Sequence, residues 1–144
     1  VSNFDTDDMQ ELWQEPGGED CATNQVLYHL ASRGIEYSLL PECQQRQIPL
    51  MAYCPLAQAG RLRRGLFASE YLNQLAQQKG ISVAQLLLAW VIRKEGVIAI
   101  PKASSVAHVQ DNAAALQVSF SSDELALLNS HFPPPAAKEP LDVV

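Results

Sequence analysis

The sequence lacks a long hydrophobic run and contains little cysteine. No apolar stretch approaches the ~20 residues of a membrane-spanning helix, which excludes a bilayer span. The three cysteines, Cys21, Cys43 and Cys54, form no CxxC pair and have no histidine at metal-ligand spacing. This pattern excludes a disulfide scaffold and a zinc site, and it favours reduced thiols in a cytoplasmic protein.

Basic residues are also scarce, and they are unevenly placed. The net charge is −6, and the first 20 residues contain seven acidic side chains and no Lys or Arg. Because nucleic-acid binding depends on Lys and Arg that neutralise phosphates, this composition argues against a nucleic-acid partner. Seven of the ten basic residues lie in 53–105. They form either a surface for a small anion or an ordinary solvated face.

The remaining composition is that of a globular protein, with 47% hydrophobic and 18% charged residues. The 144 residues amount to about one domain at the usual ~150 residues per domain. The chain starts at Val1 rather than at methionine, and it opens without the pattern of a secretory signal. We therefore expect a fragment of a longer protein.

Apolar runs and turn signals alternate along the chain. Strands are predicted at 22–28, 48–53 and 97–100, with 1–3 as the stub of a fourth. The last two runs are nearly all apolar, which predicts burial on both faces. Helices are predicted at 6–14, from about Pro41, at 68–79, 83–92, 105–116 and 122–131, with a loop containing Gly60 and Gly65. This order favours an α/β fold with a parallel sheet.

The polar residues next to the apolar runs are the candidates for a binding site, because α/β proteins bind ligands at the carboxyl ends of their strands. Four places qualify: 2–3, 24–25, 53–56 and 101–102. Amides there can pair with a carboxamide, and Tyr53 can stack on a flat ring. Lys102, followed by two serines at a helix start, suits a phosphate. The ordinary structural alternatives are amides that satisfy the backbone, a core tyrosine and a solvated lysine.

Four motifs, taken in order, resemble the second half of the aldo-keto reductase family. They are Val1-Ser2-Asn3-Phe4, Asn24-Gln25-Val26, Met51-Ala52-Tyr53-Cys54-Pro55-Leu56, and Ile100-Pro101-Lys102-Ala103-Ser104-Ser105 through His108 and Asn112. The resemblance extends from Val1 to about Leu128. Within the family, the sequence is most similar to bacterial reductases of methylglyoxal and other small aldehydes. This resemblance implies the C-terminal half of a (β/α)8 TIM barrel, from the end of its fifth strand to the eighth, over 1–132. An extended C-terminal tail follows at 133–144.

The resemblance also implies NADPH as the cofactor, and it assigns roles to individual residues. Ser2, Asn3 and Gln25 would hold the nicotinamide carboxamide, and Tyr53 would stack on the ring. The pyrophosphate loop would consist of Cys54, Pro55, Leu56 and Gln58. Lys102, Ser104 and Ser105 would bind the 2′-phosphate side of the adenosine, and the adenine end would face His108, Asp111 and Asn112.

The sequence departs from the family pattern at three positions and lacks the catalytic residues. Family members usually have Ser at Cys54, often Gly at Ala57 and commonly Arg at His108, so selectivity for NADPH would rest chiefly on Lys102. The family's catalytic Asp, Tyr, Lys and His would precede Val1. We therefore assign no catalytic residue, and we expect the parent enzyme to reduce small aldehydes or ketones.

A second hypothesis is a free-standing half barrel without catalytic activity that binds a nucleotide or self-associates through its open sheet edges. The substrate is left open by the sequence, since half of the specificity loops of such a barrel would be missing. The tail at 133–144 is compatible with a cover over the pocket and with a flexible end.

Overall fold

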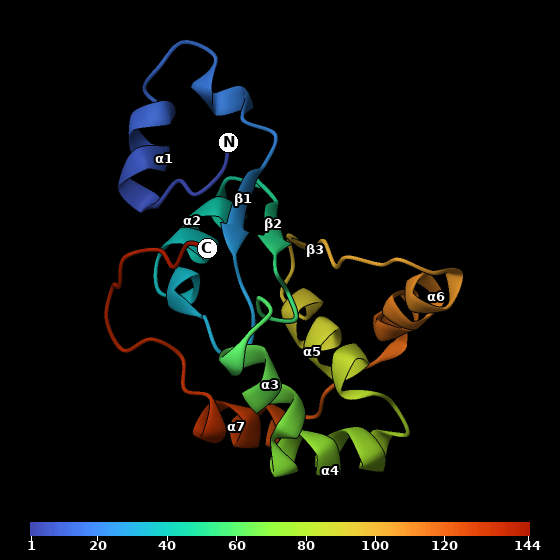
Figure 1. Ribbon diagram of the computed structural model, residues 1–144. Coiled ribbons are helices and arrows are strands. Elements are labelled where there is room, and N and C mark those ends of the chain that lie inside the picture. Colours follow the sequence, from blue (N-terminus) through green and yellow to red (C-terminus); the bar gives the residue numbers. More distant parts are fainter.

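The computed structural model describes residues 1–144, which are built around a parallel sheet (Figure 1). The strands β1 (Asn24–Leu27), β2 (Leu50–Tyr53) and β3 (Val97–Ala99) lie side by side in this order. Residues 1–3 add a fourth parallel segment beside β1 through the bridge between Ser2 and Gln25. The predicted parallel sheet and the strand stub are confirmed.

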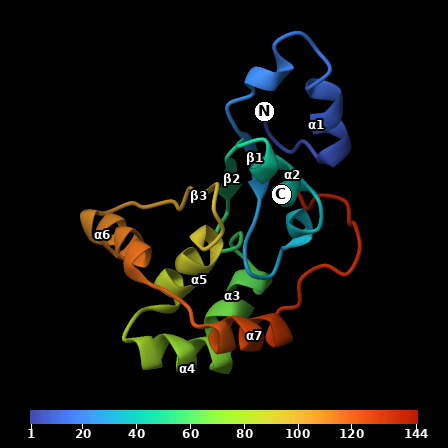
Figure 2. The ribbon, with the colours of Figure 1, turned by 180° about the vertical axis from the view of Figure 1, so that it is seen from behind.

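Seven α-helices and three short 3-10 helices connect and cover these strands (Figures 1 and 2). The α-helices are α1 (Thr6–Leu12), α2 (Leu39–Gln45), α3 (Arg61–Ala68), α4 (Glu70–Lys79), α5 (Val83–Ile92), α6 (Val106–Ala114) and α7 (Ser122–His131). The 3-10 helices are η1 (Gly18–Asp20), η2 (Gly34–Glu36) and η3 (Ala115–Gln117). None of the helices is long and apolar enough to cross a membrane.

The helices cover one face of the sheet, and the other face is partly open. Val26, Leu50 and Ala52 are at most 1% exposed and pack in one core cluster with apolar side chains of α2 and α5. On the opposite face, Met51 is half-buried and Ile98 is 46% exposed. The prediction that β2 and β3 are buried on both faces is therefore wrong. A sheet with helices on one side and open on the other has the form of a barrel wall.

The predicted loop before residue 68 is also wrong, because Arg61–Ala68 forms the helix α3. Arg and Leu are strong helix formers, and one internal glycine, Gly65, costs only about 1 kcal/mol against them. Ser69 has extended backbone angles and separates α3 from α4, where its side chain accepts a hydrogen bond from the amide of Leu72.

The predicted helix starts are confirmed where a capping residue is present. Asp5, Ser82 and Ser121 each form a reciprocal capping box with the third helical residue of α1, α5 and α7. The C-terminal cap of α4 is Gly80, with a φ of 67° in the left-handed region.

The tail, residues 133–144, runs from α7 along one side of the molecule toward β1 and α2 (Figures 1 and 2). Polar contacts hold it there. Lys138 Nζ donates to Asp7 Oδ1 at 3.1 Å, and Ser32 Oγ donates to Asp142 Oδ2 at 2.6 Å. The tail is therefore attached at both its middle and its end.

Candidate functional site

Ser2, Asn3 and Gln25 meet where the first segment pairs with β1. The Gln25 carbonyl accepts from the Asn3 amide at 2.8 Å and from Ser2 Oγ at 3.1 Å. The Gln25 amide donates to the Val1 carbonyl at 3.0 Å. The sequence suggested that Gln25 lies at the carboxyl end of its strand, but it is the second residue of β1. The segment 1–3 and β1 are staggered, so that Ser2 pairs with Gln25. The stagger places it beside the end of the neighbouring segment.

The neighbouring Asn24 has a structural role. It is fully buried, its Nδ2 donates to the Phe4 carbonyl at 2.7 Å, and its Oδ1 accepts from the Phe4 amide at 3.4 Å. These bonds fix the backbone directly after Asn3, which has a φ of 55° in the left-handed region. Asparagine tolerates this conformation better than most residues do. Asn24 therefore helps to position Asn3. Its side-chain amide has the ordinary structural role that the sequence left open, which is to satisfy backbone groups.

Tyr53 is the last residue of β2 and lies in register with Leu27 of β1. Side chains two residues apart on a strand share a face, and Gln25 precedes Leu27 by two. Gln25 and Tyr53 therefore project from the same, partly open face of the sheet. The Tyr53 hydroxyl oxygen is buried and has no hydrogen-bond partner in the chain.

The segment after β2 turns sharply. The Ala57 amide donates to the Cys54 carbonyl at 2.8 Å, and both residues have left-handed φ values, 49° at Cys54 and 60° at Ala57. Such strained non-glycine residues are concentrated at functional sites. Ala57 stands where the family often has glycine, which adopts this conformation without cost. Pro55, Leu56 and Gln58 complete this turn.

Gln58 lines a cavity of about 320 Å³ together with residues that the sequence did not single out for the site. They include Leu27, Arg61 and the last three residues of the chain, 142–144. The clustering of arginines after the turn was the sequence signal for Arg61, which the sequence left open as an anion-binding or solvated residue. The sequence left the tail open as a cover over the pocket or a flexible end, and the structure places its last residues beside Gln58.

The remaining candidates lie on the far side of β3. Lys102 and Ser104 are exposed in the segment between β3 and α6, and Lys102 takes part in no ion pair. The Ser105 side chain caps α6 by accepting from the His108 amide at 3.2 Å. Asp111 and Asn112 follow on that helix, and Asp111 Oδ1 accepts from Gln85 Nε2 at 3.3 Å. Figure 1 shows α6 well apart from β1 and the N-terminus, so the candidates form two groups.

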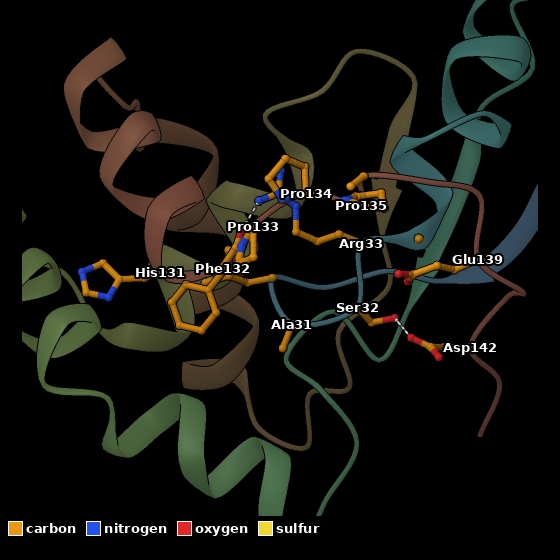
Figure 3. Close-up of a pocket in the computed structure, with 13 residues that line it drawn as sticks. Ala31, Ser32, Arg33, His131, Phe132, Pro133, Pro134, Pro135, Glu139 and Asp142 are labelled. Carbon is orange, nitrogen blue, oxygen red and sulfur yellow. Dashed lines mark hydrogen bonds between the residues drawn. The ribbon is translucent and has the colours of Figure 1, made fainter.

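A separate cavity of about 370 Å³ lies between the loop after β1 and the tail (Figure 3). It is lined by 13 residues, among them Arg33, Phe132, Glu139 and Asp142, and it contains none of the predicted site residues. The Arg33 guanidinium donates to the Phe132 carbonyl, and the bond from Ser32 to Asp142 closes the other side. This cavity is a consequence of how the tail is attached.

Tyr28 and His29 resemble acid–base residues by type, but their surroundings oppose that role. Burial lowers the pKa of His29 to about 4, and its Nδ1 accepts from the Ala31 amide at 3.2 Å. Burial also raises the pKa of Tyr28, whose hydroxyl donates to Glu36. Both side chains are therefore held in structural hydrogen bonds.

The parallel sheet has helices on one face, and polar residues lie near the strand ends on its open face. This arrangement is that of half a (β/α)8-barrel protein. Residues 1–132 match the aldo/keto reductase family. The chain belongs to this family, as its four motifs indicated.

Relatives of known structure and sequence extend this result. The chain is 64% identical over 144 residues to the methylglyoxal reductase YeaE of Escherichia coli, covering 100% of this chain and 51% of the relative. It is 30% identical over 125 residues to the glyoxal reductase of Bacillus subtilis, covering 87% of this chain and 42% of the relative. An aldo/keto reductase of Klebsiella pneumoniae, crystallised with NADP and acetate, superposes with a TM-score of 0.96 at 64% identity over 100% of this chain and 51% of its own. The chain thus spans about half the length of these relatives or less.

Proposed function

We propose that this chain forms the cofactor-binding half of an NADPH-dependent reductase of small aldehydes and ketones such as methylglyoxal. The observation that carries the proposal is the 64% identity over the whole chain to a bacterial methylglyoxal reductase. An equally similar Klebsiella protein has been crystallised with NADP. When bound, the cofactor would supply the hydride for carbonyl reduction.

The geometry around β1 and β2 fits a nicotinamide. The side-chain amide of Asn3 makes no hydrogen bond in the chain, and Gln25 Oε1 accepts none, so both can pair with the carboxamide. Tyr53 lies on the same open face as Gln25, where its ring would stack on the nicotinamide. Ser2 would complete this group. The strained turn of Cys54, Pro55, Leu56 and Gln58 would follow the pyrophosphate.

The second group fits the other end of an extended dinucleotide. Lys102 has no partner within the chain and would bind the 2′-phosphate with Ser104 and Ser105. His108, Asp111 and Asn112 lie on successive turns of α6 and would face the adenine.

We assign no residue of this chain to proton transfer. Hydride transfer to a carbonyl requires an acid for the forming alkoxide, and the structural hydrogen bonds of Tyr28 and His29 support the absence of that group here. We expect the 144-residue chain to bind NADPH without reducing methylglyoxal. Turnover by the purified chain would contradict this part of the proposal.

Titration of NADPH against the purified chain, followed by calorimetry, tests the cofactor site. Lys102→Ala should weaken NADPH binding about tenfold or more and leave NADH binding nearly unchanged, because a charged hydrogen bond to the 2′-phosphate is lost. Lys94→Ala is the matched control, since Lys94 is also exposed and lies just before β3. Equal NADPH affinity of wild type and Lys102→Ala would remove Lys102 from the site.

The second candidate function, assembly with another copy of the chain, is favoured by one observation. Large apolar side chains are exposed on β3, α6 and the residues that follow each of them: Ile98 46%, Ile100 38%, Val106 75%, Val109 56% and Leu116 71%. The outer edges of β3 and of residues 1–3 are also unpaired within the chain. Two copies around an axis parallel to the strands would pair these edges and close eight strand segments.

Light scattering over a range of concentrations tests this assembly. The wild-type chain should form dimers, and Val109→Lys should shift it toward monomer because a charge is placed in the apolar surface. Leu127→Lys is the control, since Leu127 is 52% exposed and lies on a different helix, α7. A wild-type chain that stays monomeric at all concentrations would exclude self-assembly.

A further inference from the structure

The side chain of Gln25 has one hydrogen bond, and it is to a thioether. Gln25 Nε2 donates to Met51 Sδ at 3.2 Å. Gln25 and Met51 are direct partners in the register of β1 and β2, so their side chains stand next to each other on the open face. Both are half-buried.

The backbone of Gln25 is held in place by hydrogen bonds from the neighbouring segment. Its carbonyl accepts two hydrogen bonds from residues 2–3, and its amide donates to the first residue. The Cα position is therefore fixed, and the rotation of the terminal amide decides which of its two polar atoms faces Met51. An amide turned by half a rotation would place Oε1 against Met51 Sδ, where two acceptors meet without a hydrogen between them.

We infer that Met51 is a positioning residue for Gln25: its sulfur holds the Nε2 group, so that Oε1 faces the open side of the sheet. This inference rests on the proposed function, in which that oxygen accepts a hydrogen bond from the nicotinamide carboxamide. Met51 lies two residues before Tyr53 on the same face of β2, so the positioned amide lies next to the ring that would stack on the nicotinamide. Met51 itself contacts Gln25 and not the reacting atoms.

Two substitutions of similar size separate positioning from packing. Met51→Leu keeps an apolar side chain but removes the acceptor. Met51→Gln supplies a carbonyl acceptor at a similar distance from the backbone and should restore the orientation of the Gln25 amide. Equal melting temperatures of the three proteins would show that all are folded alike.

Calorimetry with two ligands gives the readout. Met51→Leu should weaken NADPH binding about threefold to tenfold, the range of one ordinary hydrogen bond. Binding of adenosine 2′,5′-bisphosphate, which has no nicotinamide, should not change. Met51→Gln should bind NADPH within about twofold of wild type. In a Gln25→Ala background, Met51→Leu should cause no further loss, as expected for two residues that act as a unit.

The results distinguish failure of this inference from failure of the proposed function. Wild-type NADPH affinity in Met51→Leu, or an equal loss in the Gln25→Ala background, would overturn the role of Met51. A folded wild-type chain that binds neither ligand would overturn the proposed function and, with it, the nicotinamide contact. In that case the NMR signals of the Gln25 side-chain amide test the contact with Met51 directly. These signals should shift in Met51→Leu and return toward their wild-type positions in Met51→Gln. Unchanged signals in Met51→Leu would exclude the contact.

Discussion

At the scale of single residues, His29 is a titratable group that folding places in an unfavourable position for its charged form. It is 2% exposed and is the second residue after β1. Burial lowers its pKa from 6.5 to about 4, although nearby Asp142 acts in the opposite direction. The unfolded chain therefore binds a proton on His29 between these two pH values, and the folded chain does not.

His29 should accordingly make the protein less stable as the pH falls from about 6.5 to 4, by about 3 kcal/mol in total. Stability is unaffected by this group above pH 6.5, where both states are neutral. His29→Asn keeps an acceptor near the position of Nδ1 and should flatten this part of the pH profile. Urea unfolding at several pH values measures the effect. His108→Gln is the control, because His108 is exposed, and an equal change in both variants would contradict the assignment to His29.

At the scale of elements, glycines at different positions in the helices have opposite effects. Gly80 caps α4 with a φ of 67°, and an added Cβ would meet no atom within 4 Å. Gly65 lies inside α3, and its Cβ would also meet nothing. Since neither position has a steric conflict, the backbone conformation alone decides what alanine does.

Gly80→Ala should therefore destabilise the protein by about 1 kcal/mol, because alanine is strained in the left-handed conformation. Gly65→Ala should stabilise it by about 0.5 to 1 kcal/mol, because alanine is the better helix former. Chemical denaturation of the two variants beside wild type measures both changes. Changes of the same sign would show that packing, and not backbone conformation, decides these positions.

The helices with strong local signals were the predictable elements. Ser82 and Ser121 were expected to start helices because capping boxes are local, and both do. The helix α3 was missed because Gly60 and Gly65 suggested a loop, whereas its Arg and Leu residues favour the helix. The exposure of Ile98 was missed because an apolar run indicates a strand but not how many of its faces are covered.

In the candidate site, the residue types could be predicted from the sequence, but several of their contacts could not. Its residue types were recognisable as motifs, and the structure joins Ser2, Asn3 and Gln25 by hydrogen bonds. The contact of Gln25 with Met51 depends on strand register, which the sequence does not specify. The approach of residues 142–144 to Gln58 depends on the path of the tail.

At the scale of the whole molecule, a cluster of charges joins parts of the chain that lie far apart in sequence. Glu36 Oε2 pairs with Arg33 at 2.7 Å, and its Oε1 pairs with Arg93 at 3.0 Å. Arg33 also donates to the Phe132 carbonyl, and both guanidinium groups lie over the ring of Trp90. The cluster thus connects η2, the end of α5 and the end of α7. Arg33 and Glu36 are three residues apart, but Arg93, Trp90 and Phe132 are brought to them only by the fold.

Loss of the central carboxylate should be more costly than loss of a surface ion pair. The Glu36 side chain is 10% exposed, and its partners Arg33 and Arg93 are 5% and 13% exposed. Burial alone would raise the pKa of Glu36, but hydrogen bonds from Arg33, Tyr28 and Arg93 outweigh it and lower the pKa. The stability that this group provides is therefore present above about pH 4.5 and is lost as the pH falls through its lowered folded-state value.

Glu36→Gln should destabilise the protein by about 3 kcal/mol at pH 7, because two mostly buried guanidinium groups lose their counter-charge while the side chain keeps its shape. Lys138→Ala is the matched comparison, since it removes exposed ion pairs to Asp5 and Asp7 and should leave stability nearly unchanged. Urea unfolding at pH 7 and pH 4 measures both variants. The difference between Glu36→Gln and wild type should shrink at the lower pH, where the Glu36 carboxylate of the unfolded wild-type chain binds a proton and that of the folded chain is still ionised. A difference that stays constant with pH would mean that Glu36 acts through packing and not through its charge.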